Sequence, residues 1–367
     1  MLKTRIRPWL IVSGLCLLYV AIVLLLNNGD PLALVTPGTR FSQGDPNGSE
    51  GYDGQFVYYI ARDPGSAAQF IDVPAYRFQR ILLPALARAL AFGQTPLLPW
   101  ALLVINLVSL ALGTALLENL LIQHRISRWY ALTYGLTIGT FGAVRLSLPE
   151  PLAYALVLGG VVLAQRKRWL WSAALFALAA LARETTLLFP FGYGLFLLSR
   201  RQIRTAVKFG AITLIPFAIW QLVLYQHFGS FGINSGGAMA TPFEIIPFAG
   251  VIRIITDSPP EARTGLLMIF GAILIPFVIV PTLWALWRIW KDKPDWSACT
   301  FLLFTNAAIM PLVPFSTYRE PLGILRFIVG LQIAVILYAA ERRQMRALRN
   351  STIWILTLLF TVTLLNG

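Results

Sequence analysis

The sequence predicts an all-α protein that crosses a membrane many times, and its composition, its apolar runs and the placement of its charges each support this fold class. Of the 367 residues, 57% are hydrophobic and 13% are charged, whereas ordinary soluble proteins carry roughly 25% charged residues. Apolar runs long enough to cross a bilayer recur along the whole chain. We therefore expect one membrane domain over residues 1–367.

Eleven apolar runs, each bounded by charge, Pro or Gly, are the predicted spans. In chain order they cover residues 9–27, 97–121, 129–145, 149–165, 169–183, 185–199, 207–226, 264–287, 297–314, 322–340 and 351–366. The first run follows Lys3, Arg5 and Arg7, and it is longer than the apolar core of a typical signal peptide. It is therefore expected to be a retained first span.

The charges predict an orientation. If the spans alternate, one set of loops holds nineteen cations and four acids, and the other set holds eleven arginines and twelve acids. The cation-rich set is expected to be cytoplasmic, with the N-terminus inside and the C-terminus outside. The net charge of +14 is then a topology signal. Spread over six short loops, it gives no support for a nucleic-acid partner.

Two long connections, residues 28–96 and 227–263, are predicted to lie outside the cytoplasm. In the first, residues 52–61 and 75–92 place apolar side chains at helical spacing, which predicts helices at the membrane surface. The chain has two cysteines, both inside apolar runs, and they provide no disulfide framework (Cys16 and Cys299). Its two histidines are more than a hundred residues apart and lack the spacing of a zinc site (His124 and His227). No metal site is predicted.

Charged residues in the outer turns are the candidates for chemistry. Asp53 lies between glycines at the start of a predicted helix, where it can either meet a ligand or cap the helix. Three other outer turns each bring an arginine and a glutamate to similar depth: Arg145 with Glu150, Arg183 with Glu184, and Arg319 with Glu320 and Arg326. Arginine binds phosphate with two hydrogen bonds, so these turns indicate a site for an anionic, membrane-held substrate. The alternative is a local salt bridge in each turn.

Several motifs resemble those of the GT-C superfamily, integral-membrane glycosyltransferases that take sugars from polyprenyl-phosphate donors. Residues 52–64 (Tyr-Asp-Gly-Gln-Phe-Val-Tyr-Tyr-Ile-Ala-Arg-Asp-Pro) and 76–84 (Tyr-Arg-Phe-Gln-Arg-Ile-Leu-Leu-Pro) are similar to the first outer loop of mannosyltransferase-like members. Residues 148–151 (Leu-Pro-Glu-Pro) and 181–186 (Leu-Ala-Arg-Glu-Thr-Thr) resemble the middle spans. The resemblance covers residues 1–200 and continues as a span pattern with Arg319-Glu320-Pro321.

The resemblance implies an inverting transfer of a sugar to an acceptor outside the cytoplasm, with Asp53 as general base. It implies that the donor phosphate is bound by Arg183, Arg319, Arg326 and Arg145. Its implied supporting residues are Tyr52, Gln55, Asp72, Arg80, Glu150, Glu184 and Glu320. Many members carry a second acid beside the first, but this chain has Gly54 there, and the nearest other acids are Asp63 and Asp72.

The implied partners are a polyprenyl-phosphate sugar donor, a glycan, lipid or protein acceptor, and membrane lipids. No cofactor is assigned, and participation of a divalent cation is left open. Two other functions stay as alternatives. One is a catalytically silent scaffold subunit of a membrane complex. The other is a secondary transporter, which would carry interrupted or charged segments near the bilayer midplane and an inverted repeat.

Overall fold

The computed structural model describes residues 6–257 and 259–365. All regular secondary structure in this part is helical, apart from an isolated β-bridge between Pro37 and Gly51, so the predicted all-α class is confirmed. Lys3 and Arg5 of the predicted N-terminal cations, and residue 366 of the last predicted span, lie outside the described residues.

Six helical stretches of the described chain are long and apolar enough to cross a membrane, judged by length and composition. They match six predicted spans. In chain order they are α1 (Pro8–Leu26), η3 with α6 (Thr95–Leu97 and Leu98–Gln123), α12 (Ile203–Phe228), α14 with η8 and α15 (Pro260–Leu274, Ile275–Ile279 and Val280–Lys291), α18 with α19 (Pro321–Phe327 and Val329–Glu341), and α20 with η10 (Met345–Ser351 and Thr352–Leu364).

Four other predicted spans correspond to shorter helices, so the count of eleven is not confirmed. These are α9 (Glu150–Gln165), α10 (Trp169–Ala182), η6 with α11 (Glu184–Leu187 and Leu188–Ser199), and α16 with η9 (Ala298–Ala308 and Met310–Leu312). A helix of 16 residues such as α9 is about 24 Å long, less than the roughly 30 Å of the hydrocarbon core.

The predicted span 129–145 is interrupted in the structure. Its pieces are η4 (Arg128–Ala131), α7 (Leu132–Gly135), η5 (Ile138–Gly142) and α8 (Ala143–Arg145). A Cβ on Gly139 would lie 2.5 Å from the carbonyl oxygen of Leu325, so this backbone is pressed against α18. The Thr140 hydroxyl donates to the Tyr134 carbonyl, and the Ile138 N–H donates to the Thr357 hydroxyl (3.2 Å). These contacts replace regular helical hydrogen bonds in a buried segment.

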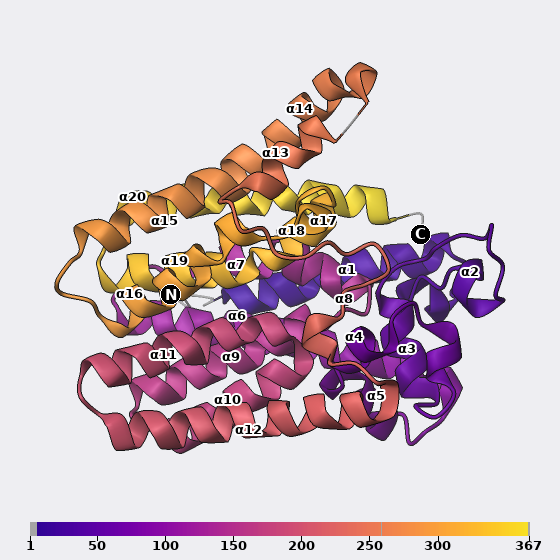
Figure 1. Ribbon diagram of the computed structural model, residues 1–367, viewed down its shortest axis with the longest axis horizontal. Helices are drawn as coiled ribbons and strands as arrows, with labels where there is room; N and C mark the ends of the chain where they lie inside the picture. The colour runs from indigo at the N-terminus through magenta and orange to yellow at the C-terminus, as the bar shows by residue number, and fades with distance from the viewer. Residues whose placement is uncertain (1–5, 258, 366–367) are drawn as a thin grey trace, which may run out of the picture.

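The centre of the bundle is α19, in which every residue from Val329 to Ala340 is buried. It packs against α16, which packs against α11, while α9 packs against both α6 and α10. Figure 1 shows the long helices running roughly side by side along the long axis, with α2 to α5 gathered at one end. We call this the loop end.

The loop end contains α2 (Thr39–Ser42), α3 (Gly54–Arg62), α4 (Pro74–Phe78) and α5 (Leu82–Leu90), with η1 (Pro31–Leu34) and η2 (Ala67–Phe70). The predicted helix over 52–61 is thus observed as α3. Its residues from Gly54 to Ala61 are buried, so it does not lie on the surface as expected. The predicted helix over 75–92 is divided, because Pro84 fits only in the first turn of a helix that restarts at Leu82.

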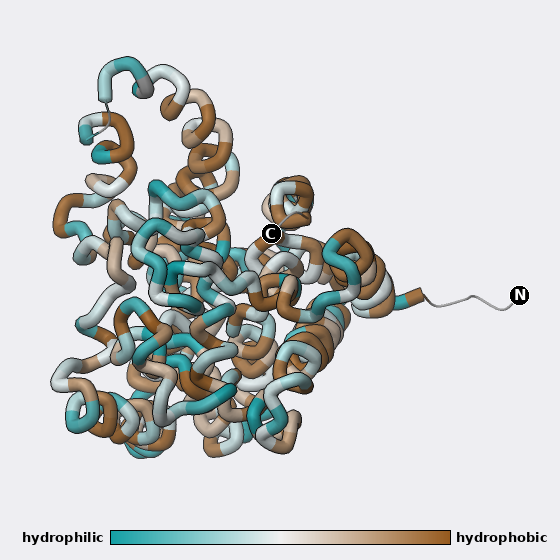
Figure 2. Tube along the Cα trace, turned by 90° about the vertical axis from the view of Figure 1, so that its right-hand side faces the viewer, coloured by the Kyte–Doolittle hydropathy of each residue, from teal (hydrophilic) through white to brown (hydrophobic). Residues whose placement is uncertain are grey.

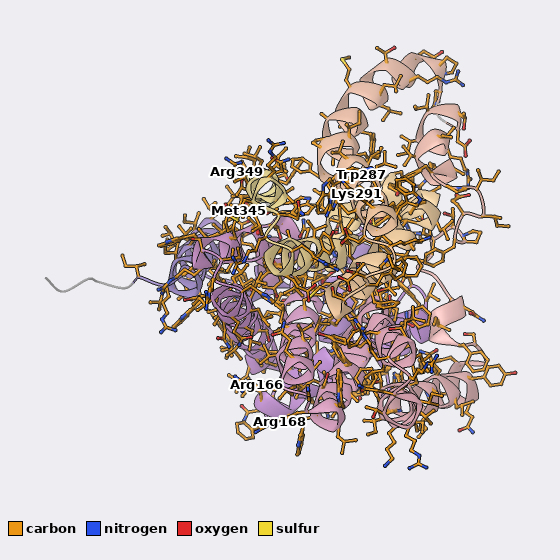
Figure 3. The ribbon with its side chains drawn as sticks, turned by 90° about the vertical axis from the view of Figure 1, so that its left-hand side faces the viewer. Arg166, Arg168, Trp287, Lys291, Met345 and Arg349 are labelled. Atoms are coloured by element: carbon orange, nitrogen blue, oxygen red, sulfur yellow. The ribbon has the colours of Figure 1, made fainter. Side chains whose placement is uncertain are left out.

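The second long connection also reaches the loop end. It consists of η7 (Gly232–Asn234), an irregular stretch 235–248 and α13 (Ala249–Thr256), beside α17 (Phe315–Tyr318). Figure 2 looks onto this end, where hydrophilic turns lie across the bundle and the hairpin of α13 and α14 projects from it. Figure 3 looks onto the opposite end, which we call the basic end, and shows Arg166, Arg168, Lys291 and Arg349 there.

Candidate functional site

Asp53 is held between two arginines at the loop end. It is the residue before the first turn of α3, but its side chain makes no capping hydrogen bond, so the helix-cap alternative is wrong. Its Oδ1 accepts from Nη1 of Arg77 and its Oδ2 accepts from Nη1 of Arg326, both at 2.9 Å. The side chain keeps 30% of its surface exposed. Asp53 is therefore accessible but fully engaged by guanidinium groups.

Besides Asp53, two other groups fix Arg77. Asp72 accepts from its Nε at 2.7 Å and its Nη2 at 2.8 Å, and the Phe56 ring centroid lies 4.2 Å from the guanidinium carbon. Arg77 was not among the site residues predicted from the sequence. The signal was its position three residues before Arg80, because residues one helical turn apart lie on the same face of a helix. Asp72, expected as an alternative acid, thus orients the arginine that contacts Asp53.

Glu150 is the buried counter-ion of the cluster. Its side chain is fully buried, and its Oε1 accepts from Nε of Arg326 at 2.6 Å and also from Nη1 of Arg183. Arg326 donates from Nη1 to the Tyr52 hydroxyl at 3.1 Å, and that hydroxyl donates to Glu320 at 2.9 Å. One carboxylate therefore holds two arginines, and one of these arginines reaches Asp53.

The ion pairs join different turns. Arg80 donates to Glu184 through Nε at 2.9 Å and Nη2 at 2.6 Å, and it also donates to the Tyr76 hydroxyl. In the described residues no ion pair forms within the turns Arg145–Glu150, Arg183–Glu184 or Arg319–Glu320. The alternative of local salt bridges is therefore wrong, and the turns at the loop end are linked into one cluster.

Arg145 and Gln55 hold the backbone and are not part of this cluster. Arg145 is fully buried and donates to the carbonyls of Leu364 (3.0 Å) and Ala33 (2.7 Å). Gln55 accepts from the Gly38 N–H at 3.0 Å and donates to the Glu50 carbonyl at 2.6 Å. The structure thus places Arg145 apart from the arginines with which it was grouped.

Packing explains why a glycine follows Asp53. A Cβ on Gly54 would lie 2.0 Å from the carbonyl oxygen of Leu146, so no second acid fits at this position. The other nearby acid, Asp63, accepts from the Gly65 N–H at 3.1 Å and from the Ser66 hydroxyl at the far end of α3. Two other carboxylates share an arginine with Asp53: Asp72 shares Arg77, and Glu150 shares Arg326.

The arginines keep the site carboxylates ionised. Burial raises the pKa of Asp53, but the charges of Arg77 and Arg326 outweigh burial and hold the pKa well below its ordinary value. Burial likewise opposes ionisation of Glu184, and Arg80 lowers the pKa of that carboxyl to about 2. With both oxygens bound to arginine, Asp53 is a weak proton acceptor in this arrangement.

The cluster lines a cavity of about 2180 Å³. Its charged part is lined by six arginines and five carboxylates, namely Arg40, Arg77, Arg80, Arg183, Arg319, Arg326, Glu50, Asp53, Asp72, Glu184 and Glu320. Arg319 is exposed, and within the described residues it forms no ion pair; its guanidinium carbon lies 5.3 Å from the centre of the Phe315 ring. It is the lining arginine most available to an added anion.

The same cavity continues as an apolar groove between α11 and α12. Its lining there includes Leu188, Phe191, Leu195 and Leu198 from α11, and Phe209 and Leu214 from α12. Gly194 and Gly210 also line it, and a Cβ on either would meet open space. The groove can therefore admit a long apolar chain.

No group of three or more His, Cys, Asp or Glu side chains in the described chain is placed to hold a metal ion. Comparison with known protein families, with characterised proteins and with solved structures finds no match for this chain.

Glu184 provides a test of the cluster through the pH dependence of stability. Its lowered pKa stabilises the folded protein above the ordinary glutamate value of 4.5, and this contribution is lost as the pH falls toward about 2. We expect Glu184→Gln to cost about 3–5 kcal/mol at pH 7, because Arg80 loses its counter-ion. The melting temperature of this variant should change less than that of the wild type between pH 5 and pH 3.

The matched control is Glu261→Gln, which changes an exposed residue of α14 and should follow the wild-type melting profile. If Glu184→Gln melts at the wild-type temperature throughout this pH range, the pair does not stabilise the fold.

Proposed function

We propose that this protein is an inverting glycosyltransferase that moves a sugar from a polyprenyl-phosphate donor to an acceptor outside the cytoplasm. The observation that carries the proposal is the single cavity in which an arginine-rich cluster beside Asp53 continues into an apolar groove. A donor of this class combines an anionic phosphate with a long hydrocarbon chain, and the cavity offers a complementary surface to each part.

The proposed positions of the donor follow from the cavity lining. The hydrocarbon chain lies along α11 and α12, beside Leu188, Leu195 and Leu214. The phosphate lies among the arginines, with Arg319 as its first contact because this side chain has no carboxylate partner in residues 6–257 and 259–365. The sugar then extends toward Asp53, and its anomeric carbon faces the acceptor hydroxyl.

In the proposed reaction the acceptor oxygen attacks the anomeric carbon while its proton passes to Asp53. The bond between that carbon and the phosphate oxygen breaks, polyprenyl phosphate leaves with the electron pair, and the configuration inverts. The phosphodiester of the donor carries one negative charge and the departing phosphate monoester gains a second. Arginines that already contact the donor phosphate stabilise this added charge as it develops.

The same arginines account for the protonation state of Asp53. In the free protein, Arg77 and Arg326 keep its carboxylate ionised but weakly basic. A bound phosphate competes with Asp53 for these guanidinium groups. When an arginine turns to the phosphate, Asp53 becomes a stronger proton acceptor, so donor binding prepares the base.

The orientation of the site in the membrane is part of the proposal. Cations gather at the basic end, as Figure 3 shows for Arg166, Arg168, Lys291 and Arg349, and the cluster lies at the loop end. The positive-inside rule then assigns the basic end to the cytoplasm and the cavity to the other side.

A secondary transporter is the second candidate, favoured by the interrupted segment 128–145 in the middle of the bundle. Its buried polar side chains are three threonines and an arginine that donates to backbone carbonyls, namely Thr133, Thr137, Thr140 and Arg145. The segment contains no carboxylate, whereas the carboxylates of the cavity lie at the loop end. The transporter would be favoured if vesicles containing the wild-type protein took up a polar solute but showed no sugar transfer. The Asp53→Asn variant should then keep the same solute uptake. Absence of both activities would favour the scaffold.

Asp53→Asn tests the proposed reaction. With the base removed, release of polyprenyl phosphate from radiolabelled polyprenyl-phosphate mannose should fall at least ~100-fold, because the acceptor proton has no recipient. The variant should still bind the donor. Asp63→Asn, at the other end of α3, is the matched control and should keep full activity. Wild-type rates in Asp53→Asn would remove Asp53 as the base.

Arg319→Gln tests the proposed phosphate contact. We expect about tenfold weaker binding of polyprenyl phosphate, because one charge-assisted contact is lost, and unchanged binding of uncharged polyprenol. Binding can be measured by native mass spectrometry in neutral detergent. Arg319→Lys keeps the charge and should recover part of the affinity. Equal affinity of wild type and Arg319→Gln for the phosphate would place the donor elsewhere.

Gly194→Leu and Gly210→Leu test the groove. Each adds a side chain where the structure has open space along the proposed path of the lipid. We expect about tenfold lower affinity for a long polyprenyl phosphate and little change for a ten-carbon isoprenyl phosphate. Gly14→Leu on α1, where a Cβ also meets nothing within 4 Å, is the control. Equal effects on both chain lengths would contradict a chain in this groove.

A further inference from the structure

The basic end has many cations and few free acids. Its four acidic side chains already have partners inside the protein, in the contacts Arg288–Asp292 (3.1 Å), Arg342–Asp295 (3.3 Å), Arg128–Glu118 (3.4 Å) and Ser297–Glu341. Among the described residues, Lys291 and Arg349 form no ion pair. This end therefore presents positive charge that the protein does not neutralise.

One face of α15 changes from apolar to cationic toward the basic end. This face carries four residues at spacings of three or four, which places them in one stripe along the helix: Val280, Leu283, Trp287 and Lys291. The first three side chains are exposed by 50–54%. The Lys291 ammonium lies 5.2 Å from the centre of the Trp287 ring, a distance that permits a cation–π contact.

A second stripe that combines a cation with apolar residues runs along α20 and η10. Met345, Arg349 and Ile353 are four residues apart, and Leu356 follows at the three-residue spacing of the 3-10 helix. Met345 and Leu356 are exposed. Figure 3 shows Trp287, Lys291, Met345 and Arg349 at the same end of the molecule. Each stripe therefore has a cation at the basic end and continues beyond it as apolar surface, although Met345 precedes Arg349 in the second stripe.

The two stripes belong to helices that are fixed to each other. The Trp354 indole N–H of η10 donates to the Phe277 carbonyl of η8 at 2.9 Å, and Trp354 is almost completely buried. A lipid that contacts these helices therefore meets a rigid arrangement of cations. Each stripe has the order of a phospholipid, with a charged group at the membrane surface and apolar groups below it.

We propose that the stripes of α15 and α20–η10 bind anionic phospholipids of the leaflet at the basic end. Lys291 and Arg349 contact the lipid phosphates, Trp287 lies at the level of the headgroups, and Leu283 and Leu356 contact the acyl chains. Diacyl phosphate lipids with net negative charge are the ligand class. This binding is independent of the sugar transfer proposed for the opposite end.

The test uses the full chain purified in neutral detergent and titrated with phosphatidylglycerol or with phosphatidylcholine of the same acyl chains, measured by native mass spectrometry. The double variant Lys291→Gln, Arg349→Gln should bind phosphatidylglycerol about thirtyfold more weakly, because each cation beside an anionic lipid contributes roughly fivefold. Its affinity for phosphatidylcholine and its melting temperature in that lipid should not change, since both side chains lie outside the internal ion pairs.

Arg166→Gln, Arg168→Gln is the matched control. It removes the same charge from the same end, as Figure 3 shows, but away from the stripes. It should weaken phosphatidylglycerol binding less than threefold. Equal losses in the two double variants would mean that binding reflects only the diffuse potential of this end, and would overturn the proposal. So would unchanged binding in Lys291→Gln, Arg349→Gln, or displacement of the lipid by inorganic phosphate.

Discussion

The contact on which the loop end depends is the buried carboxylate of Glu150 bound by both Arg183 and Arg326. Arg183 and Arg326 line the cavity but are largely buried. Two such guanidinium groups are costly to bury without a counter-ion, and removing that counter-ion would leave both uncompensated. Arg326 reaches Asp53 from this position, and Glu184, the neighbour of Arg183, holds Arg80. The geometry around Asp53 is therefore set by an acid that lies beneath the cavity.

Because each pair joins a different turn, the cluster also fixes how the helices meet. Asp53 of the first loop is linked to Arg326 of α18, and Arg80 is linked to the turn between α10 and α11. The local charges are nearly balanced, so an added anion must either displace a carboxylate or use Arg319, which has no carboxylate partner in the described chain. Such a site favours a ligand that itself competes for arginine.

Hydropathy was sufficient to predict the all-α class and six long helices, because a run of apolar residues has few alternatives in a bilayer. It could not predict the break in 128–145, which depends on the contact of Gly139 with α18 and on the Thr140 hydroxyl replacing a backbone donor. The arginines and glutamates of the loop end were identifiable from sequence. Their pairing was not, because Arg183 and Glu150 are distant in the chain, and Arg145 proved to hold backbone carbonyls.

Arginine has different partners at different positions of the molecule. Around the cavity, carboxylates orient the guanidinium groups of Arg77, Arg80 and Arg326, so these groups hold fixed positions in the ligand-free protein. At the basic end, Arg349 extends from an exposed helix face without a carboxylate partner in the described chain. An oriented arginine can distinguish the geometry of a reacting phosphate, whereas an unpaired one on a lipid-facing helix recognises mainly charge. Residue type alone does not separate the two settings; the carboxylate partner does.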